Sequence, residues 1–163
     1  MMNHNDILRR SRFIFNLRDA EMQSIFALVN HQISTAHLRA LLQADEDPEF
    51  VLCKDRELAL FLNGLIIKNR GARDESPVKI EQRISNNIIL RKFKIALDMK
   101  TEDVLSTLEL ADFKMGASEL TAFFRKADHK NYRKCKDQIL RKFMIGLQLK
   151  YRPDSLADKE GNV

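Results

Sequence analysis

The chain has 163 residues, of which 44% are hydrophobic and 31% are charged, and its formal net charge is +5. This balance is typical of a folded globular protein and excludes a disordered or low-complexity chain. The richest apolar stretch, residues 58–67, is far shorter than the roughly 20 residues that cross a bilayer, and the first arginines are not followed by a signal-like apolar segment, so we expect a cytoplasmic protein without a membrane segment.

An internal repeat organises the chain. Residues 5–70 match residues 87–152 without a gap at a constant offset of 82 positions, most closely where residues 53–55 recur as residues 135–137. Two copies are too few for a solenoid, which usually needs about three or more units. A unit of about 66 residues would be marginally stable alone. The repeat therefore predicts two units that are related by an approximate two-fold and share one core.

The apolar spacing predicts an all-α fold. Hydrophobic residues recur at intervals of three and four in both copies, which indicates four helices in each unit and no strand. In chain order, these helices centre on residues 7–15, 22–29, 38–42 and 58–66, each with a counterpart 82 residues later.

Two details concern helix ends and helix crossings. Asp19 and Thr101 stand where the side-chain oxygen of an N-cap would accept the free amides of the second helix in each copy. Gly64 and Gly146 lie inside the fourth helix, where glycine costs roughly 1 kcal/mol relative to alanine. We therefore expect another helix to cross both glycines so closely that a Cβ atom would not fit.

The domain boundaries follow from the repeat. Residues 1–70 are predicted to form the first helical repeat and residues 87–152 the second. Residues 71–86 contain a charged linker with Pro77 and the start of the first helix of the second unit. Residues 153–163 have no apolar period and are predicted to be a flexible polar tail.

No catalytic, cofactor or metal site is predicted. The acidic stretch of residues 45–49 lacks the glycine and the bidentate glutamate of a calcium loop, because Phe50 and Arg56 stand in their places. Cys53 and Cys135 share one equivalent position instead of forming a C-x-x-C pair, so we expect two reduced, partly buried structural thiols. No histidine recurs between the copies or stands at a signature spacing from a cysteine, and no glycine-rich phosphate loop is present. We therefore predict a protein that is not an enzyme.

The two copies carry opposite charges at equivalent positions. Residues 43–60 hold six acidic and two basic side chains, whereas residues 125–142 hold eight basic and two acidic ones. Asp45, Glu46, Asp47 and Glu49 are the candidate contact for a basic partner. The candidate contact for a nucleic acid or an acidic partner consists of Arg125, Lys126, Lys130, Tyr132, Arg133, Lys134, Lys136, Arg141 and Lys142. Alternatively, both stretches are solvated loops.

A second basic feature recurs on the first helix of each copy. Arg9 and Arg12 correspond to Arg91 and Lys94, on the side opposite the apolar stripe. These side chains either keep a helix face solvated or add phosphate contacts to the candidate nucleic-acid surface.

Two further patterns bear on nucleic-acid recognition. Tyr132 stands among basic residues, as in proteins that stack a base of a single strand while they follow its backbone. Because Phe50 is its counterpart in the acidic copy, the aromatic residue equally suits a plug that anchors the loop. The second and third helices have the length and turn of a helix-turn-helix. However, the carboxylate of Glu119 would repel the phosphates of DNA, so ordinary helix packing is the favoured interpretation.

The tracts over residues 60–66 (LFLNGLI) and 128–133 (DHKNYR), together with Cys135 and the residues that follow it, resemble the YehS family of small bacterial proteins. The resemblance covers residues 3–152. That family is a tandem repeat of one domain of unknown function. The resemblance therefore implies a bacterial, cytoplasmic protein with two repeats, and it implies no activity and no catalytic residue.

Taken together, these features predict a non-enzymatic binding protein. The favoured function is protein interaction or self-association, in which the acidic stretch of one molecule meets the basic stretch of the next. The alternative is backbone-directed binding of RNA or DNA through the basic surface of the second repeat.

Overall fold

The structure is a computed structural model that describes residues 2–72 and 78–155, and these residues form eight helices and no strand. The first repeat contains α1 (His4–Ile14), α2 (Asp19–Ala27), α3 (Thr35–Leu42) and α4 (Asp55–Arg70). The second contains α5 (Asn86–Ala96), α6 (Thr101–Leu110), α7 (Ala117–Ala122) and α8 (Asp137–Tyr151). The predicted all-α fold with four helices per unit is confirmed. Among the described residues, no helix combines the length and apolarity that crossing a bilayer requires.

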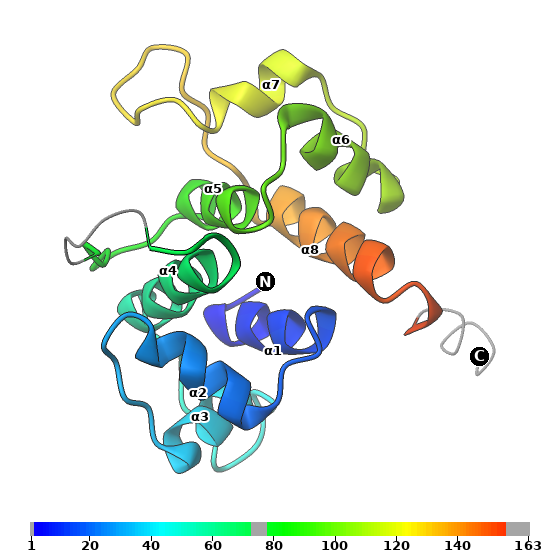
Figure 1. Ribbon diagram of the computed structural model, residues 1–163. Helices are drawn as coiled ribbons and strands as arrows, with labels where there is room; N and C mark the ends of the chain where they lie inside the picture. Colours follow the sequence, from blue (N-terminus) through cyan, green and yellow to red (C-terminus); the bar gives the residue numbers. More distant parts are fainter. Residues whose placement is uncertain (1, 73–77, 156–163) are drawn as a thin grey trace.

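The two repeats pack through their first and last helices. The helices α1, α4, α5 and α8 occupy the centre of the molecule, α2 and α3 lie at one end, and α6 and α7 lie at the opposite end (Figure 1). Helix α4 packs against α5, and α8 packs against α1. This exchange of contacts between equivalent helices is what an approximate two-fold would produce, and the two-fold itself stays a prediction.

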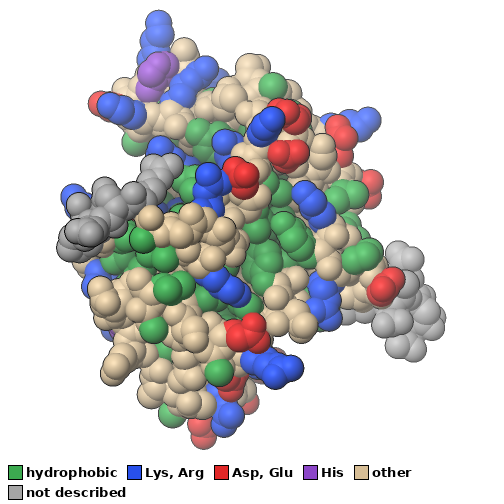
Figure 2. Space-filling view, in the orientation of Figure 1, with side chains coloured by type: hydrophobic (Ala, Val, Ile, Leu, Met, Phe, Trp, Pro, Cys, Tyr) green, Lys and Arg blue, Asp and Glu red, His purple; other side chains and the backbone are tan. Residues whose placement is uncertain are grey.

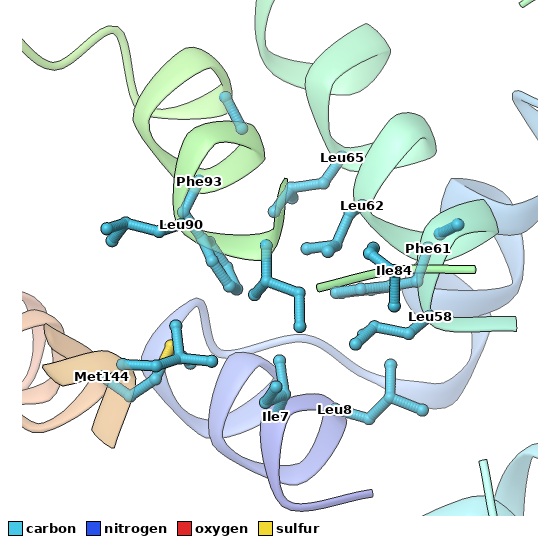
Figure 3. Packing of buried hydrophobic residues seen from close by; sticks show 14 of the residues in the cluster. Ile7, Leu8, Leu58, Phe61, Leu62, Leu65, Ile84, Leu90, Phe93 and Met144 are labelled. Carbon is cyan, nitrogen blue, oxygen red and sulfur yellow. The ribbon is translucent and has the colours of Figure 1, made fainter. Parts of the chain in front are cut away.

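A single core runs through both repeats. In Figure 3, Leu58 and Phe61 of α4, Phe93 of α5, Ile7 of α1 and Met144 of α8 point toward one another. The residues predicted to be buried are at most 2% exposed: Leu58, Phe61, Leu65, Leu140, Phe143 and Leu147. The prediction of a shared core is therefore confirmed, and the burial of these apolar side chains is the main force that holds the repeats together.

A buried asparagine ties the loop before α4 to the start of α1. The amide nitrogen of Asn5 donates hydrogen bonds to the backbone carbonyls of Leu41 and Val51, both at 2.8 Å. Its amide oxygen accepts a hydrogen bond from the backbone N–H of Cys53 at 2.9 Å. Asn5 is 0% exposed, so its buried side-chain amide is satisfied by three backbone groups of the loop.

The second repeat contains the same arrangement. The amide nitrogen of Asn87 donates to the carbonyls of Phe123 and Arg133 at 3.1 and 2.7 Å, and its oxygen accepts the N–H of Cys135 at 2.9 Å. We call each set of three hydrogen bonds an asparagine clamp. Every partner of Asn87 lies 82 positions after the corresponding partner of Asn5, so the repeat conserves the clamp in both sequence and geometry.

The helix ends show why the predicted N-caps are wrong. Asp19 and Thr101 are the first helical residues, and Arg18 and Lys100 hold the cap positions without a side-chain hydrogen bond. The carboxylates of Glu21 and Asp103 instead accept the backbone N–H of these cap residues at 3.2 and 2.7 Å. The acidic residue of the first turn therefore reaches back to the cap, which is one half of a capping box.

The segment between the repeats is partly built into the core. Ile84 is 9% exposed and belongs to the core cluster. Glu81 forms an ion pair of 2.7 Å with Lys92 of α5 and accepts a hydrogen bond of 2.9 Å from Asn63 of α4. Burial alone would raise the pKa of Glu81, but its hydrogen bonds from Lys92 and Asn63 outweigh burial and hold this pKa below its ordinary value. This polar contact therefore joins α4 to α5.

Parts of the predicted linker and tail lie outside the described residues. These parts are residues 73–77, which include Pro77, and residues 156–163. The tail is described as far as Ser155, whose hydroxyl accepts a hydrogen bond of 3.2 Å from the side-chain amide of Gln148 in α8.

The fourth helix of each repeat crosses the second helix of the same repeat at a glycine. A Cβ atom added to Gly64 would lie 2.2 Å from the carbonyl oxygen of Ile25 in α2, and one added to Gly146 would lie 2.0 Å from that of Thr107 in α6. Ile25 and Thr107 are themselves equivalent positions of the repeat. The predicted close crossing is confirmed, and it is a contact between backbones that no side-chain rotation can relieve.

We expect Gly64→Ala and Gly146→Ala each to lower the free energy of unfolding by about 1–3 kcal/mol, because the methyl group must push two helices apart. The accompanying gain in helix propensity is only about 1 kcal/mol. Urea unfolding followed by circular dichroism measures the change. Gly116→Ala is the matched control, since its Cβ would meet only the flexible carboxylate of Glu119, at 3.3 Å. Wild-type stability in both helix variants would contradict the close crossing.

The asparagine clamps lead to a second prediction. Asn5→Ala and Asn87→Ala should each cost about 3 kcal/mol, because each leaves one buried carbonyl (Leu41 or Phe123) and one buried N–H (Cys53 or Cys135) without a partner, at about 1–3 kcal/mol per group. The exposed Gln138→Ala should change stability by less than about 0.5 kcal/mol. Amide hydrogen exchange adds a local readout, in which the N–H of Cys53 should lose protection in the Asn5 variant. Unchanged exchange there would show that the clamp does not hold the loop.

Candidate functional site

The two loops that precede the fourth helices share the same backbone hydrogen bonds and differ in their side chains. We call residues 44–52 the acidic lobe and residues 126–134 the basic lobe. In the acidic lobe, the N–H of Asp47 donates to the carbonyl of Ala44 at 2.9 Å, and the N–H of Phe50 donates to that of Asp47 at 3.0 Å. In the basic lobe, His129 and Tyr132 make the equivalent two bonds at 2.9 and 3.0 Å. Each lobe is therefore a compact double turn, closed by its asparagine clamp.

The basic lobe forms one wall of a groove of about 740 Å³. The other walls are the turn between α6 and α7, the helix α7 and the start of α8. Its basic residues are Lys114, Arg125, Lys130, Arg133, Lys134 and Lys136, and its apolar and aromatic residues include Phe113, Met115, Phe123, Tyr132 and Ile139. We call this site the basic groove. Its volume suits a few side chains of a bound segment.

The basic residues of the groove have no acidic partner among the described residues. Across residues 2–72 and 78–155, every ion pair joins side chains between residues 4 and 98. Figure 2 shows lysine and arginine side chains, together with a histidine, gathered at the end of the molecule where the basic lobe projects. The positive charge there is consequently exposed to solvent and uncompensated at short range.

In the first repeat, by contrast, the candidate basic residues Arg9 and Arg12 are paired with carboxylates. Arg9 pairs with Asp6, and with Asp45 of the acidic lobe at 3.1 Å. Arg12 pairs with Asp19. Arg9 and Arg12, which the sequence offered as phosphate contacts, are therefore already bound to carboxylates, and Asp45 is already occupied by Arg9.

Glu46 and Glu49 of the acidic lobe differ from Asp45 in their ion pairs. All three are exposed, but neither glutamate forms an ion pair with another described residue. Asp47 accepts the N–H of Glu49 at 2.8 Å within the turn. The negative charge that a partner could meet thus comes chiefly from the two glutamates.

The remaining predicted residues lie outside the groove. Lys126 is exposed on the basic lobe, and Arg141 and Lys142 lie on α8. Arg91 is exposed on α5, whereas Lys94 lies over the ring of Phe124 with 5.5 Å between its ammonium nitrogen and the ring centroid. The structure therefore brings together Arg125, Lys130, Tyr132, Arg133, Lys134 and Lys136 and leaves the other basic candidates elsewhere on the surface.

Several groove residues were not predicted from the sequence. Phe113, Lys114 and Met115 belong to the turn between α6 and α7, and Ile139 belongs to the first turn of α8. The sequence predicts this turn only as the connection within a helix-turn-helix. Its Lys114 was the one signal of a basic site there, and nothing in the sequence places that turn against the basic lobe.

The arrangement does not favour reading of double-stranded DNA by α7. This helix has six residues and packs mainly on α6. Glu119 lies in the groove and accepts the N–H of Gly116 at 3.3 Å. A carboxylate at that point would repel a phosphate backbone.

The two cysteines are unsuited to nucleophilic chemistry. Cys53 and Cys135 are free and only 3% and 5% exposed. Burial, reinforced by the nearby carboxylates of Glu57 and Asp55, raises the pKa of Cys53 to about 12. Burial together with Asp137 raises the pKa of Cys135 to about 12 as well. Both side chains are therefore neutral thiols at physiological pH, and the thiolate is the reactive form.

Comparisons with known proteins agree with the repeat. A family model described as "Protein of unknown function (DUF1456)" matches the chain twice, over residues 4–71 and 86–152. The "Uncharacterized protein YehS" of Escherichia coli (strain K12) is 40% identical over 147 residues, which cover 90% of this chain and 94% of that protein. No solved structure matches. The resemblance inferred from the sequence is thus confirmed, and it assigns no ligand to the groove.

Thiol labelling tests the burial of the cysteines. Near pH 8 the native protein should react with Ellman's reagent about a hundredfold or more slowly than the protein unfolded in guanidinium, because burial and the raised pKa together suppress the thiolate. Ser118→Cys, at an exposed groove position, should add one thiol that reacts at once. Fast reaction of the wild-type protein would show that its cysteines are accessible.

Proposed function

Because the chain belongs to the DUF1456 family, whose description carries no activity, we propose from the geometry of the groove that it is a non-enzymatic binding protein. Its second repeat holds an acidic segment of a protein partner in the basic groove. The observation that carries this proposal is the set of basic side chains that have no ion-pair partner in the described part of the chain and that surround an apolar floor, formed by Phe113, Met115 and Ile139. We also propose that binding takes place in the cytoplasm, where two free thiols stay reduced.

The floor of the groove supports a protein partner. Phe113, Met115 and Ile139 are half-buried there, so part of their apolar surface is available to an apolar side chain of a bound segment. Glu119 in the same groove would oppose a continuous phosphate backbone. A segment with separate carboxylates and an apolar side chain can place its charges on Lys114, Lys130 or Lys134 and avoid this glutamate.

A second candidate function uses the same groove for single-stranded nucleic acid. Tyr132 is half-buried and lines the groove between Lys130 and Arg133. An aromatic ring between basic side chains can stack a base, while the phosphates of the strand's backbone contact the basic side chains. Such binding would be directed at the backbone and would weaken steeply with added salt, because each neutralised phosphate releases counterions.

The triple variant Lys130→Glu, Arg133→Glu and Lys134→Glu tests both candidates. It should weaken binding of an acidic, leucine-containing peptide by about tenfold or more, since three surface charge contacts become repulsive. Fluorescence anisotropy of the labelled peptide measures the loss, and a labelled single-stranded RNA is titrated in parallel. The matched control reverses three exposed lysines away from the groove, Lys68, Lys79 and Lys100.

The outcomes separate the candidates. Peptide binding that is lost in the groove variant and kept in the control supports the proposed function. Tight RNA binding with no peptide binding would replace it with the nucleic-acid function. Failure of both probes to bind at low salt, or equal losses in the two variants, would overturn the groove as a binding site.

A further inference from the structure

We propose that the acidic partner of the basic groove is the acidic lobe of a second copy of this chain. This inference rests on the proposed function and names its ligand. The contact joins unlike ends of two molecules, so each copy offers one acidic lobe and one basic groove.

The charges of the two surfaces are complementary. Glu46 and Glu49 are exposed on the acidic lobe. Lys114, Lys130 and Lys134 are exposed at the groove and have no ion-pair partner within the described part of the chain. Complementary potentials of this kind orient the approach of two surfaces and select the partner.

The acidic lobe also presents apolar side chains. Val51 is 40% exposed and Leu52 is 59% exposed, which makes Leu52 the most exposed of the large hydrophobic residues described. The equivalent positions in the basic lobe are Arg133 and Lys134, so only the lobe of the first repeat presents apolar groups at these two positions. A segment in which Leu52 follows Glu49 by three positions is of the kind that a basic groove with a floor of Phe113 and Met115 can bind, with the apolar group below and the charge at the rim.

Both surfaces are already ordered before they meet. Each lobe is a double turn, and the N–H of Val51 donates to the carbonyl of Ala40 at 3.1 Å as the N–H of Arg133 donates to that of Ala122 at 3.2 Å. The asparagine clamps then fix the two lobes to α1 and α5. Little conformational entropy is lost when such surfaces associate, which favours binding.

The arrangement excludes contact between the two surfaces of one molecule. The loop after α3 lies near the end of the molecule formed by α2 and α3, and the loop after α7 lies at the opposite end (Figure 1). The contact is therefore heterologous, and repeated contacts close into a ring or continue as a chain. One lobe in one groove is a smaller contact than the interfaces of about 1,200–2,000 Å² typical of stable complexes. We accordingly expect association at high protein concentration and low salt.

Sedimentation of the full chain and two charge-reversed variants tests the inference. The lobe variant is Glu46→Lys with Glu49→Lys, and the groove variant is Lys130→Glu, Arg133→Glu and Lys134→Glu. At low salt the wild type should gain mass with concentration, and about 1 M salt should reverse the gain because the Debye length falls to about 3 Å. Each variant alone should stay monomeric, since its lobe and groove now carry the same sign.

The mixture of the two variants is the decisive sample. The native lobe of the groove variant meets the native groove of the lobe variant, and the two altered surfaces are complementary as well. An equimolar mixture should therefore associate although neither variant does. The control variant Glu102→Lys with Glu109→Lys, at exposed positions of α6, should associate like the wild type.

Other results would overturn the inference. A wild type that stays monomeric at every concentration and salt, or a mixture that does not associate, would show that the second copy is not the partner. If the groove then still binds the acidic peptide, the proposed function stands and its partner is another protein. If peptide binding fails too, the proposed function falls with the inference. Circular dichroism of each variant excludes unfolding as the cause.

Discussion

The hydrogen bonds of the two asparagine clamps are the constraint on which the candidate surfaces depend. Asn5 and Asn87 join the start of the first helix in each repeat to the loop before the fourth helix, through three backbone groups each. Because the partners are backbone groups, the side chains of the loop are free to vary without loss of the clamp. The same double turn can therefore carry carboxylates in one repeat and ammonium or guanidinium groups in the other. Even the turn side chain differs, since His129 accepts the N–H of Asn131 at 3.0 Å where Asp47 accepts that of Glu49.

The two repeats use their charges differently. In the first, Arg9 and Arg12 are held by nearby carboxylates, so the surface is locally balanced. In the second, the basic residues of the groove lack such partners among the described residues, which costs little while the side chains stay solvated. Unpaired charges of one sign repel one another, and an acidic ligand relieves that repulsion when it binds. The two repeats therefore share one fold and differ in the charge that their surfaces leave unpaired among the described residues, which is the difference on which the proposed binding rests.

The shared core holds the two ends of the molecule in one body. The fourth helix of each repeat packs on the first helix of the other, and each crosses a second helix of its own repeat at a glycine. Glu81, Lys92 and Asn63 add a polar contact between α4 and α5. Neither repeat can bury its central helices without the other, because α4 and α8 each contribute to both halves of the core. The acidic lobe and the basic groove are consequently presented in a fixed relation.

The repeat, the all-α fold, the buried apolar faces, the glycine crossings and the opposite charges of the two lobes can all be predicted from the sequence, because these features are periodic or local and recur between the two copies. Which charges remain available depends on how the chain packs. The ion pair of Arg9 with Asp45 joins segments that are far apart in the chain. Phe113 and Lys114 line one groove with Lys130 because of the direction that the basic lobe takes. Asn5 and Asn87 are equivalent positions of the repeat, but their hydrogen-bond partners are backbone groups, which the sequence does not identify. Whether a side chain is buried or forms an ion pair depends on how the chain packs. For that reason the groove could not be predicted from residue types alone.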